Sequence, residues 1–299
     1  MSFVEGSVRV SVPATSANLG PGYDTLGLAL ELRDELTATV VGDGLRVEVV
    51  GEGSGHVSRD ETHLVVRAMR AAFGALEEWP QGLHLGCLNR VPHARGLGSS
   101  SAAIVGGIAL ARALVTDGAE RLDDGQMLSI ATAIEGHPDN VAPAVFGGFV
   151  ISGQTGTDVW ADQAPVDAAV RAVAFVPPEG ISTEVARGLL PATVSHGDAA
   201  ANAGRAALLV AALGHAPERL LRATEDFLHQ EYRRRVMPES LVLIDRLRDD
   251  GHAAVVSGAG PTVLVLTAIR DLDALTSYRP DGWGCLGLEL ATQGVTRLD

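Results

Sequence analysis

The feature that most constrains this sequence is a glycine- and serine-rich stretch, residues 91–103, between a strand-like and a helix-like segment. Before it, Leu83, Leu85 and Cys87 stand at every second position, which predicts a half-buried strand. After it, residues 102–115 are small and apolar with helical spacing. A glycine turn between a strand and a helix presents free backbone N–H groups at the positive end of the helix. The stretch is therefore expected to bind an anion, although a plain tight turn with a serine cap would show the same pattern.

Single residues of this stretch exclude two familiar phosphate-binding loops. A Walker loop has a lysine after its last glycine, where this chain has Ser99. A dinucleotide-binding loop has a third glycine where this chain has Ser101. The chain contains no lysine, so all of its 23 basic residues are arginines. Mechanisms that need an active-site lysine, including protein-kinase, Schiff-base and pyridoxal chemistry, are therefore excluded.

The charge of the chain limits its expected partners. With a formal net charge of -14, the chain is not expected to bind nucleic acid or an anionic membrane. An anionic ligand would instead be bound by local arginines and helix ends. The two cysteines suit a reducing compartment, and the sequence shows no signal peptide or spanning stretch. A cytoplasmic protein is therefore predicted.

A second glycine-rich stretch, Pro13–Gly27, follows an opening strand predicted from the alternating valines of residues 8–12. The stretch is dense in turn-forming residues and carries the polar side chains of Asn18 and Asp24. Its glycines would let a ligand approach the backbone closely. We therefore expect a loop here, either one that binds a ligand or one that is only structural.

A third polar cluster lies at a forced turn. The apolar spacing of residues 127–134 predicts a helix, and the glycine and proline that follow would stop it. The turn leaves four polar side chains that could contact a ligand: Glu135, His137, Asp139 and Asn140. A binding site and an ordinary solvated helix end are both consistent with this arrangement.

The order of the predicted elements indicates an α+β fold with two lobes. Residues 154–166 are polar and predicted to be irregular, so they mark the expected boundary between domains 1–155 and 156–299. In the second domain, strands followed by helices indicate a small antiparallel sheet backed by helices. The predicted strands are 171–176, 253–256 and 263–266, and the predicted helices are 202–213, 217–230 and 238–250.

Three glycine-bearing segments together resemble the three motifs of the GHMP small-molecule kinases. They are Pro13–Gly27, Pro92–Ala103 and Ser257–Leu266. The middle motif is shared throughout that superfamily. The first segment, which contains PATSANLGPGYD, is similar to the corresponding motif of homoserine kinases in particular. So are EGHPDNVAPAVFGG at 135–148 and FLHQEYR at 227–233. The resemblance covers nearly the whole chain.

This resemblance implies both a fold and a reaction. The fold would have an N-terminal domain like that of ribosomal protein S5 and a ferredoxin-like C-terminal domain. The reaction would transfer the γ-phosphate of ATP, with Mg²⁺, to the side-chain hydroxyl of L-homoserine, giving O-phospho-L-homoserine for threonine synthesis. Such a transfer relies chiefly on positioning and charge stabilisation. A homodimer is common among the relatives, although nothing in this sequence requires one.

The resemblance also implies roles for individual residues. Ser100 and Glu135 would hold Mg²⁺, and Asn140 stands where other members of the superfamily have a catalytic aspartate, so these three would be the catalytic residues. The ATP phosphates would lie on Pro92, His93, Ala94, Arg95, Gly96, Leu97, Gly98, Ser99, Ser100 and Ser101. Homoserine would contact Asn18, Asp24, His137, Asn140, Thr183, Arg187 and Arg233, with Asp24 on its ammonium and an arginine on its carboxylate.

Three positions depart from the usual pattern of the family. Tyr23 stands where phenylalanine is usual. His63, in the segment expected near the adenine, stands where asparagine is common. The segment 229–233 lacks the usual proline, so Arg234 competes with Arg233 for the role of contacting the carboxylate.

Two alternatives to a homoserine kinase stay open at this point. One is another small-molecule kinase of the same fold, acting on mevalonate, a sugar or an isoprenoid precursor. The lack of lysine disfavours a mevalonate-type enzyme, which uses one beside its catalytic aspartate. The other alternative is a non-catalytic sensor that binds nucleotide and amino acid. Retention of both expected metal ligands disfavours a sensor.

Overall fold

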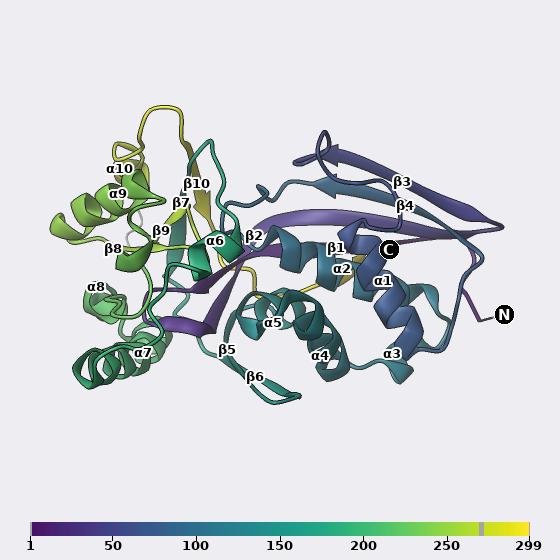
Figure 1. The fold of residues 1–299 in the computed structure, drawn as a ribbon, viewed down its shortest axis with the longest axis horizontal. Coiled ribbons are helices and arrows are strands. Elements are labelled where there is room, and N and C mark those ends of the chain that lie inside the picture. The colour runs from purple at the N-terminus through teal and green to yellow at the C-terminus, as the bar shows by residue number, and fades with distance from the viewer. Residues whose placement is uncertain (1, 269–271, 299) are drawn as a thin grey trace.

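The computed structural model describes residues 2–268 and 272–298 and has two lobes (Figure 1). The first lobe is built on a seven-stranded sheet. Its strands are β1 (Ser7–Asn18), β2 (Gly22–Val41), β3 (Gly44–Gly51), β4 (Gly82–Asn89), β5 (Phe149–Thr155), β6 (Asp158–Ala164) and β11 (Thr296–Leu298). The order is β11-β1-β2-β4-β3, with β5 paired to β2 and β6 to β5. Only the β3–β4 pair among these described strands is parallel.

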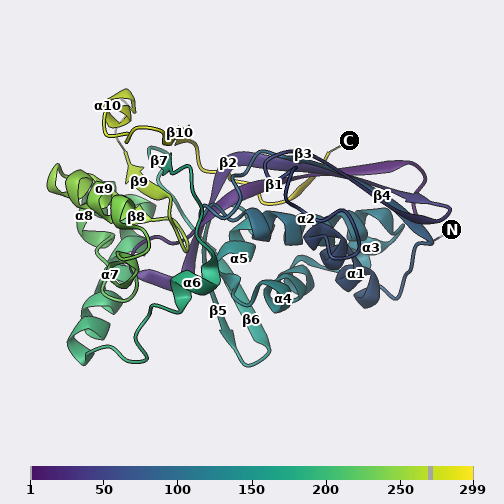
Figure 2. The same ribbon diagram turned by 45° about the horizontal axis from the view of Figure 1, so that its top comes forward.

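Helices cover one face of this sheet (Figures 1 and 2). They are α1 (Leu64–Ala75), α2 (Ser99–Leu114), α3 (Gly118–Arg121), α4 (Asp124–Glu135) and α5 (Pro138–Phe146). Alternate residues of the strands, such as Val8, Val10 and Val12 of β1, point into the core beneath these helices. The predicted strand around residues 83–87 and the helix after the glycine-rich stretch are confirmed as β4 and α2.

The second lobe contains a four-stranded antiparallel sheet with helices on both faces. In spatial order its strands are β10 (Gly284–Leu288), β7 (Arg171–Val176), β9 (Val263–Thr267) and β8 (Ala253–Val256). Alternation along the strands supplies two cores. Val255 and Leu264 pack with α7 (His196–His215) and α8 (Leu220–Ala223), whereas Val256 and Val263 pack with α9 (Pro238–Asp249). The predicted α+β class and the small antiparallel sheet are confirmed.

The shorter elements of the second lobe are α6 (Thr183–Arg187), the 3₁₀ turns η1 (Pro217–Arg219) and η2 (Glu231–Arg233), and α10 (Asp273–Thr276). The single helix predicted over 217–230 is wrong, because the chain leaves the helix after α8. There the buried carboxylate of Asp226 accepts hydrogen bonds from the backbone N–H groups of Leu228, His229 and Gln230. A side chain that bonds the local backbone competes in this way with helical hydrogen bonds. In the described part of the chain, no helix is both long and apolar enough to cross a membrane.

Pro13–Gly27, predicted as a loop, is mostly strand. β1 and β2 run through most of it, and the hairpin that they form reaches into the second lobe (Figure 1). Leu19 at the hairpin tip is fully buried in the core that contains α7 and α8. Beside it, a Cβ on Gly20 would lie 2.5 Å from the carbonyl oxygen of Thr224. The small residues of this stretch therefore let the hairpin pass closely against the second lobe.

Residues 154–166, predicted to be irregular, form most of a hairpin instead. β5 and β6 pair from Phe149 with Ala164 to Thr155 with Asp158, so β6 extends the first sheet. The C-terminal strand β11 also returns to this sheet and pairs with β1. The hairpin is polar because most of β6 is exposed or half-buried, and this exposure gave it the composition of a linker. The division at residue 155 stays a prediction.

Candidate active site

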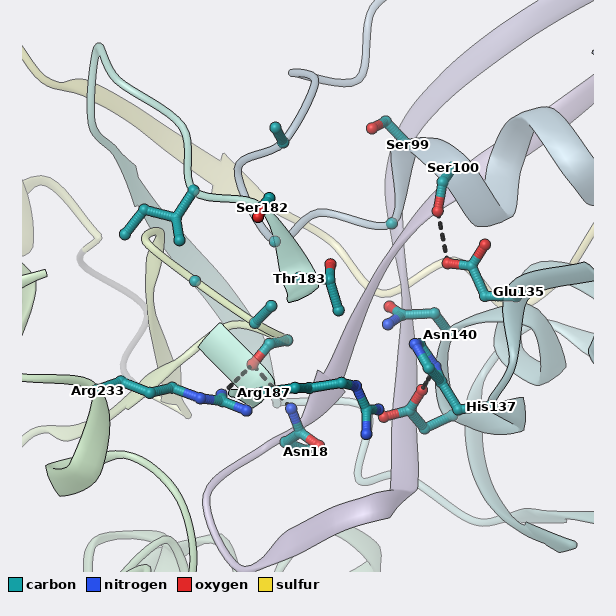
Figure 3. Close-up of a pocket in the computed structure, with 18 residues that line it drawn as sticks. Asn18, Ser99, Ser100, Glu135, His137, Asn140, Ser182, Thr183, Arg187 and Arg233 are labelled. Carbon is teal, nitrogen blue, oxygen red and sulfur yellow. Dashed lines mark hydrogen bonds and ion pairs between the residues drawn. The ribbon is translucent and has the colours of Figure 1, made fainter. Parts of the chain in front are cut away.

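A cavity of about 240 Å³ lies where the two lobes meet (Figure 3). Its walls come from the N-terminal end of α2, the turn between α4 and α5, the start and end of α6, and the loop after β8. Most of the residues predicted to bind ligands line it: Asn18, Ala94, Gly96, Gly98, Ser99, Ser100, Glu135, His137, Asn140, Thr183, Arg187 and Arg233. Segments far apart in the sequence thus come together in one cavity.

Other predicted residues lie outside this cavity. Pro92 and Ser101 do not line it, and Leu97 is fully buried in the hydrophobic core. Arg95 does not line it either, because its guanidinium donates hydrogen bonds to the carbonyl oxygens of His93, Pro177 and Pro178. Arg95 therefore anchors the glycine-rich loop to the segment that leads into α6.

A second cavity, of about 400 Å³, adjoins the first, because Ala94, Ser99 and Ser100 line both. His63 and His93, two residues singled out from the sequence, line this second cavity. Burial and the neighbouring His93 lower the pKa of His63, which keeps its imidazole neutral at neutral pH. The two cavities together offer a polar end and a more apolar end on either side of the glycine-rich loop.

The loop between β4 and α2 has a backbone that requires glycine. Gly96 and Gly98 have φ angles of 75° and 70°, in the left-handed region. A Cβ on Gly98 would lie 1.9 Å from the hydroxyl oxygen of Thr15. Gly98 is the N-cap of α2, and no side chain in the described part of the chain caps this helix. The first N–H groups of α2 are therefore available to an anion at the positive end of the helix.

Ser100 and Glu135 lie side by side in the wall of the cavity, and their side chains point toward each other (Figure 3). The Ser100 hydroxyl donates a hydrogen bond of 2.5 Å to Glu135 Oε1, and the buried Ser101 hydroxyl donates one of 3.1 Å to the same atom. Glu135 is the last residue of α4, which ends there because Gly136 adopts a left-handed φ of 94°. Hydroxyl and carboxylate oxygens are the ligands that Mg²⁺ prefers. This donor set therefore fits the metal that the resemblance implies.

His137 and Asp139 form a hydrogen-bonded pair at the start of α5. The Nδ1 atom of His137 lies 2.7 Å from Asp139 Oδ1, and Asp139 is almost fully buried. Burial by itself lowers the pKa of His137, but the hydrogen bond to Asp139 and its negative charge outweigh burial and raise that pKa. Asp139 therefore binds the imidazole of His137, and both side chains border the cavity.

Arg187 forms an ion pair with Asp24, a residue that precedes it by 163 positions in the sequence. Its Nη1 and Nη2 atoms lie 3.0 Å and 2.5 Å from the two carboxylate oxygens. Nη1 also donates a hydrogen bond of 2.9 Å to the Tyr23 hydroxyl. The sequence predicted separate ligand contacts for the two charged residues, and the structure joins them into a two-pronged pair.

Arg233 is the more unusual of the two arginines at the cavity, because it is only 1% exposed. Its Nη1 donates to the carbonyl oxygen of Gly258 and contacts His229 Nδ1, while its Nε has no hydrogen-bond partner among the described residues. No carboxylate in residues 2–268 or 272–298 forms an ion pair with it. Burial accordingly lowers its pKa. A buried guanidinium without a counter-ion favours an anionic ligand.

Arg234, the alternative left open by the sequence, lies elsewhere. Its guanidinium pairs with Glu231 and Asp245 and does not line the cavity. The two neighbouring arginines therefore differ sharply in surroundings: Arg233 is buried at the cavity, whereas Arg234 belongs to a solvated ion-pair cluster.

The two remaining predicted side chains at this end are Asn18 and Thr183. Asn18 is engaged by the protein itself, since its Nδ2 donates to Gly258 O at 2.8 Å and its Oδ1 accepts from the backbone N–H of Asp24 at 3.0 Å. Thr183 is the first residue of α6, and Ser182 caps this helix through its hydroxyl. Thr183 thus reaches the cavity from the second lobe (Figure 3).

Three residues near the cavity were not predicted from the sequence. The ring of Tyr23 lies against both arginines, with its centroid 5.5 Å from Arg187 Cζ and 5.9 Å from Arg233 Cζ. His229 is fully buried behind it, and Thr15 lies under the glycine-rich loop. All three belong to stretches that the sequence did single out. The sequence therefore pointed to the right stretches. However, no local sequence pattern distinguishes a side chain that supports a binding residue from its neighbours.

Two domain families match this chain. The N-terminal domain of the GHMP kinases matches residues 63–148, and the C-terminal domain of the GHMP kinases matches residues 208–278. With the two-lobed fold and the glycine-rich loop at a helix N-terminus, these matches define the chain as a GHMP kinase.

Full-length relatives narrow this class. The chain is 52% identical over 297 residues to a homoserine kinase of Streptomyces avermitilis, covering 99% of this chain and 97% of the relative. It is 44% identical over 300 residues to a homoserine kinase of Corynebacterium diphtheriae, covering 98% and 96%. The crystal structure of homoserine kinase from Cytophaga hutchinsonii superposes with a TM-score of 0.85 at 24% identity, covering 100% and 99%, and so supports the fold. The chain belongs to the homoserine kinase family.

Proposed function

We propose that this enzyme transfers the γ-phosphoryl group of ATP to the side-chain hydroxyl of L-homoserine, giving ADP and O-phospho-L-homoserine for threonine biosynthesis. The observation that carries the proposal is the buried guanidinium of Arg233, which has no counter-ion in the described chain and borders the same cavity as the anion-binding loop. An amino acid supplies the missing carboxylate, and ATP supplies the anion for the loop.

The amino acid end of the cavity carries both signs of charge that a zwitterion needs. Arg233 and Arg187, which line the cavity, would bind the substrate carboxylate. Asp24 does not itself line the cavity but pairs with Arg187 at its edge, and it would bind the ammonium. Because Asp24 and Arg187 pair with each other, the substrate would insert its own charges into an existing pair instead of meeting two isolated ions. Asn18, His137, Asn140 and Thr183 complete the walls around it.

The nucleotide would extend across both cavities. Its phosphates would lie against the backbone of residues 92–101, where the N–H groups of α2 are free of side-chain caps. The adenosine part would occupy the adjoining cavity, lined by His63 and His93, which shares Ser99 and Ser100 with the first. With the shared serines between the two cavities, the phosphates would lie between the base and the amino acid, as a transfer between the two requires.

Ser100 and Glu135 would hold Mg²⁺, since their oxygens meet at one point beside the loop. Bound there, the metal would neutralise negative charge on the ATP phosphates. The hydrogen bonds from Ser100 and Ser101 hold the Glu135 carboxylate in place.

In the transfer, the bond from the γ-phosphorus to the oxygen of ADP breaks, and a bond to the homoserine hydroxyl oxygen forms. We infer that no side chain acts as an indispensable base. The amide of Asn140 cannot accept the hydroxyl proton, and Asp24 is occupied by charge pairing. In a loose transition state the proton can leave late, to an oxygen of the transferred phosphoryl group. The protein then contributes by positioning and charge stabilisation.

Coupled ADP release with a substrate panel tests this proposal. With Mg·ATP, L-homoserine should support turnover at least about 10²-fold more efficiently than serine, threonine, mevalonate or galactose. Phosphorus NMR should show one new phosphomonoester. Preference for mevalonate or a sugar would indicate a different GHMP kinase, and binding of homoserine without ADP release would indicate a sensor.

We further propose a cytoplasmic enzyme that has no nucleic acid or membrane partner and forms a homodimer. The free thiols of Cys87 and Cys285 are consistent with a reducing compartment, and the net charge of -14 is unfavourable for polyanions. The homodimer rests on the resemblance to the family, and light scattering of the purified enzyme tests it.

A further inference from the structure

Thr15 connects two parts of the site that the proposed mechanism uses. It is fully buried in β1, and its backbone N–H donates to the carbonyl oxygen of Leu97 in the glycine-rich loop at 3.0 Å. Its hydroxyl donates a hydrogen bond of 2.9 Å to Asn140 Oδ1, across 125 positions of sequence. The absence of a side chain on Gly98 makes room for this hydroxyl, since a Cβ there would lie 1.9 Å from it.

The hydrogen bond determines which end of the Asn140 amide is free. A side-chain amide has one oxygen acceptor and one NH₂ donor group. With Oδ1 held by Thr15, the Nδ2 group has no hydrogen-bond partner in residues 2–268 and 272–298, and Asn140 borders the cavity. The cavity is therefore offered N–H donors at this position, and donors stabilise an oxygen that gains negative charge during a reaction.

We propose that Thr15 is a positioning residue of the reaction, which orients the Asn140 amide so that its NH₂ group donates to an oxygen of the reacting groups. This inference rests on the proposed function of the cavity. The contact of Thr15 with Gly98 and Leu97 also fixes Asn140 relative to the loop that would hold the phosphates. Thr15 itself does not line the cavity, so it acts through Asn140.

Two variants of Thr15 separate the hydroxyl from the shape of the side chain. Thr15→Val keeps the branched shape and removes the donor, so the amide can turn. We expect kcat to fall at least about tenfold, while KM for homoserine and for ATP changes less than about threefold. Thr15→Ser keeps the hydroxyl and should retain at least about a third of kcat. Circular dichroism and thermal melting confirm that both variants fold.

Thr132→Val is a matched control. Thr132 is a buried threonine of α4 whose hydroxyl has no hydrogen-bond partner in the described chain, and it does not line either cavity. Its replacement by valine removes a buried hydroxyl without touching Asn140, so kcat should stay within about twofold of wild type. An equal loss of kcat in both valine variants would show a general packing effect and overturn the positioning role.

A double-mutant cycle gives the decisive comparison. In an Asn140→Ala background, Thr15→Val should cause almost no further loss of kcat, because the group it orients is gone. Additive losses would overturn the proposal, as would a Thr15→Val enzyme that keeps more than half of wild-type kcat. A wild-type enzyme that releases no ADP with homoserine would instead overturn the proposed function.

Discussion

The two ends of the cavity differ in the groups that they offer to a ligand: backbone N–H groups at one end and side chains at the other. At the proposed nucleotide end, one continuous segment, residues 92–101, supplies backbone N–H groups at the start of α2. At the proposed amino acid end, side chains come from β1, α5, α6 and η2, and one of them, Arg187, is already neutralised by Asp24 of β2. The first end suits a ligand that is common to many enzymes, because a backbone cradle needs only glycine and a helix. The second end suits one particular substrate, because its charges must match in position.

This contrast predicts that substitutions at the two ends have separable kinetic effects. Changes among the side chains of the amino acid end should affect KM for homoserine, and changes at the metal ligands should affect kcat.

The largest effect is expected at Glu135. Glu135→Gln keeps the size of the side chain but removes the charge that would hold Mg²⁺. We expect kcat to fall at least about 10²-fold, or about 3 kcal/mol. The exposed Glu120→Gln is the control, and its steady-state kinetics should match wild type. A folded Glu135→Gln enzyme that keeps more than about a third of kcat would show that Glu135 is not a metal ligand.

The neighbouring arginines provide the next comparison. Arg233→Ala removes a buried guanidinium that has no counter-ion in the described chain. KM for homoserine should therefore rise at least about thirtyfold, or about 2 kcal/mol, and KM for ATP should change little. Arg234→Ala removes a guanidinium that pairs with Glu231 and Asp245 at the surface, and it should change both constants less than about twofold. The opposite ranking would mean that the carboxylate contact belongs to Arg234.

Tyr23 should give a smaller effect at the same end. Tyr23→Phe removes only the hydroxyl that accepts from Arg187 at 2.9 Å, and KM for homoserine should rise about threefold to tenfold. Tyr23→Leu also removes the ring beside both arginines and should raise KM further. If Tyr23→Leu were no worse than Tyr23→Phe, the ring would not contribute to the arrangement of the arginines.

The smallest kinetic effect is expected at Asp139, which contacts His137 and not the reacting groups in this account. Asp139→Asn should lower kcat less than about tenfold at saturating substrates. A loss beyond about 10³-fold with unchanged Mg·ATP binding would reveal a general base that the account omits.

Asp139→Asn should also change the dependence of stability on pH. Because the folded pKa of His137 is raised above its unfolded value, the pair stabilises the fold fully below about pH 6.5, and this contribution is lost as pH rises through the folded pKa. The variant should therefore lose more stability at pH 5.5 than at pH 8.5. Urea unfolding at both pH values measures the difference, and equal losses would contradict the pairing.

The nucleotide end was predictable from sequence because its parts are local. Strand, glycine turn and helix follow one another directly, so Gly96, Gly98 and α2 were anticipated as a unit. The helix predicted over 217–230 was wrong, because the Asp226 side chain accepts hydrogen bonds from backbone N–H groups that a continuous helix would have used. The loop predicted around Leu19 and Gly20 was wrong, because the small residues there reflect close contact of the hairpin tip with the second lobe. No local pattern in the sequence reveals that contact.

The amino acid end was predictable only as a set of residues. The family resemblance brought Asp24, Arg187 and Arg233 together, but their arrangement depends on contacts between distant segments. That Asp24 pairs with Arg187, and that Arg233 is buried while Arg234 is solvated, follows from how η2 packs beside the β1–β2 hairpin. Neighbouring residues on one turn point in different directions, and tertiary packing decides which of them reaches the cavity.

The amino acid end of the cavity is proposed to recognise both charges of its substrate, whereas the loop end contacts neither of them. Initial rates with two analogues of L-homoserine test this directly, since 4-hydroxybutanoate lacks the ammonium and 3-aminopropan-1-ol lacks the carboxylate, yet both keep the reacting hydroxyl. We predict that kcat/KM falls at least about 10²-fold for each analogue, while KM for ATP stays the same. Without a carboxylate, the buried Arg233 is left without an anion, and without an ammonium the substrate loses its proposed contact with Asp24. If either analogue were phosphorylated as efficiently as L-homoserine, the cavity would not recognise both charges of the amino acid.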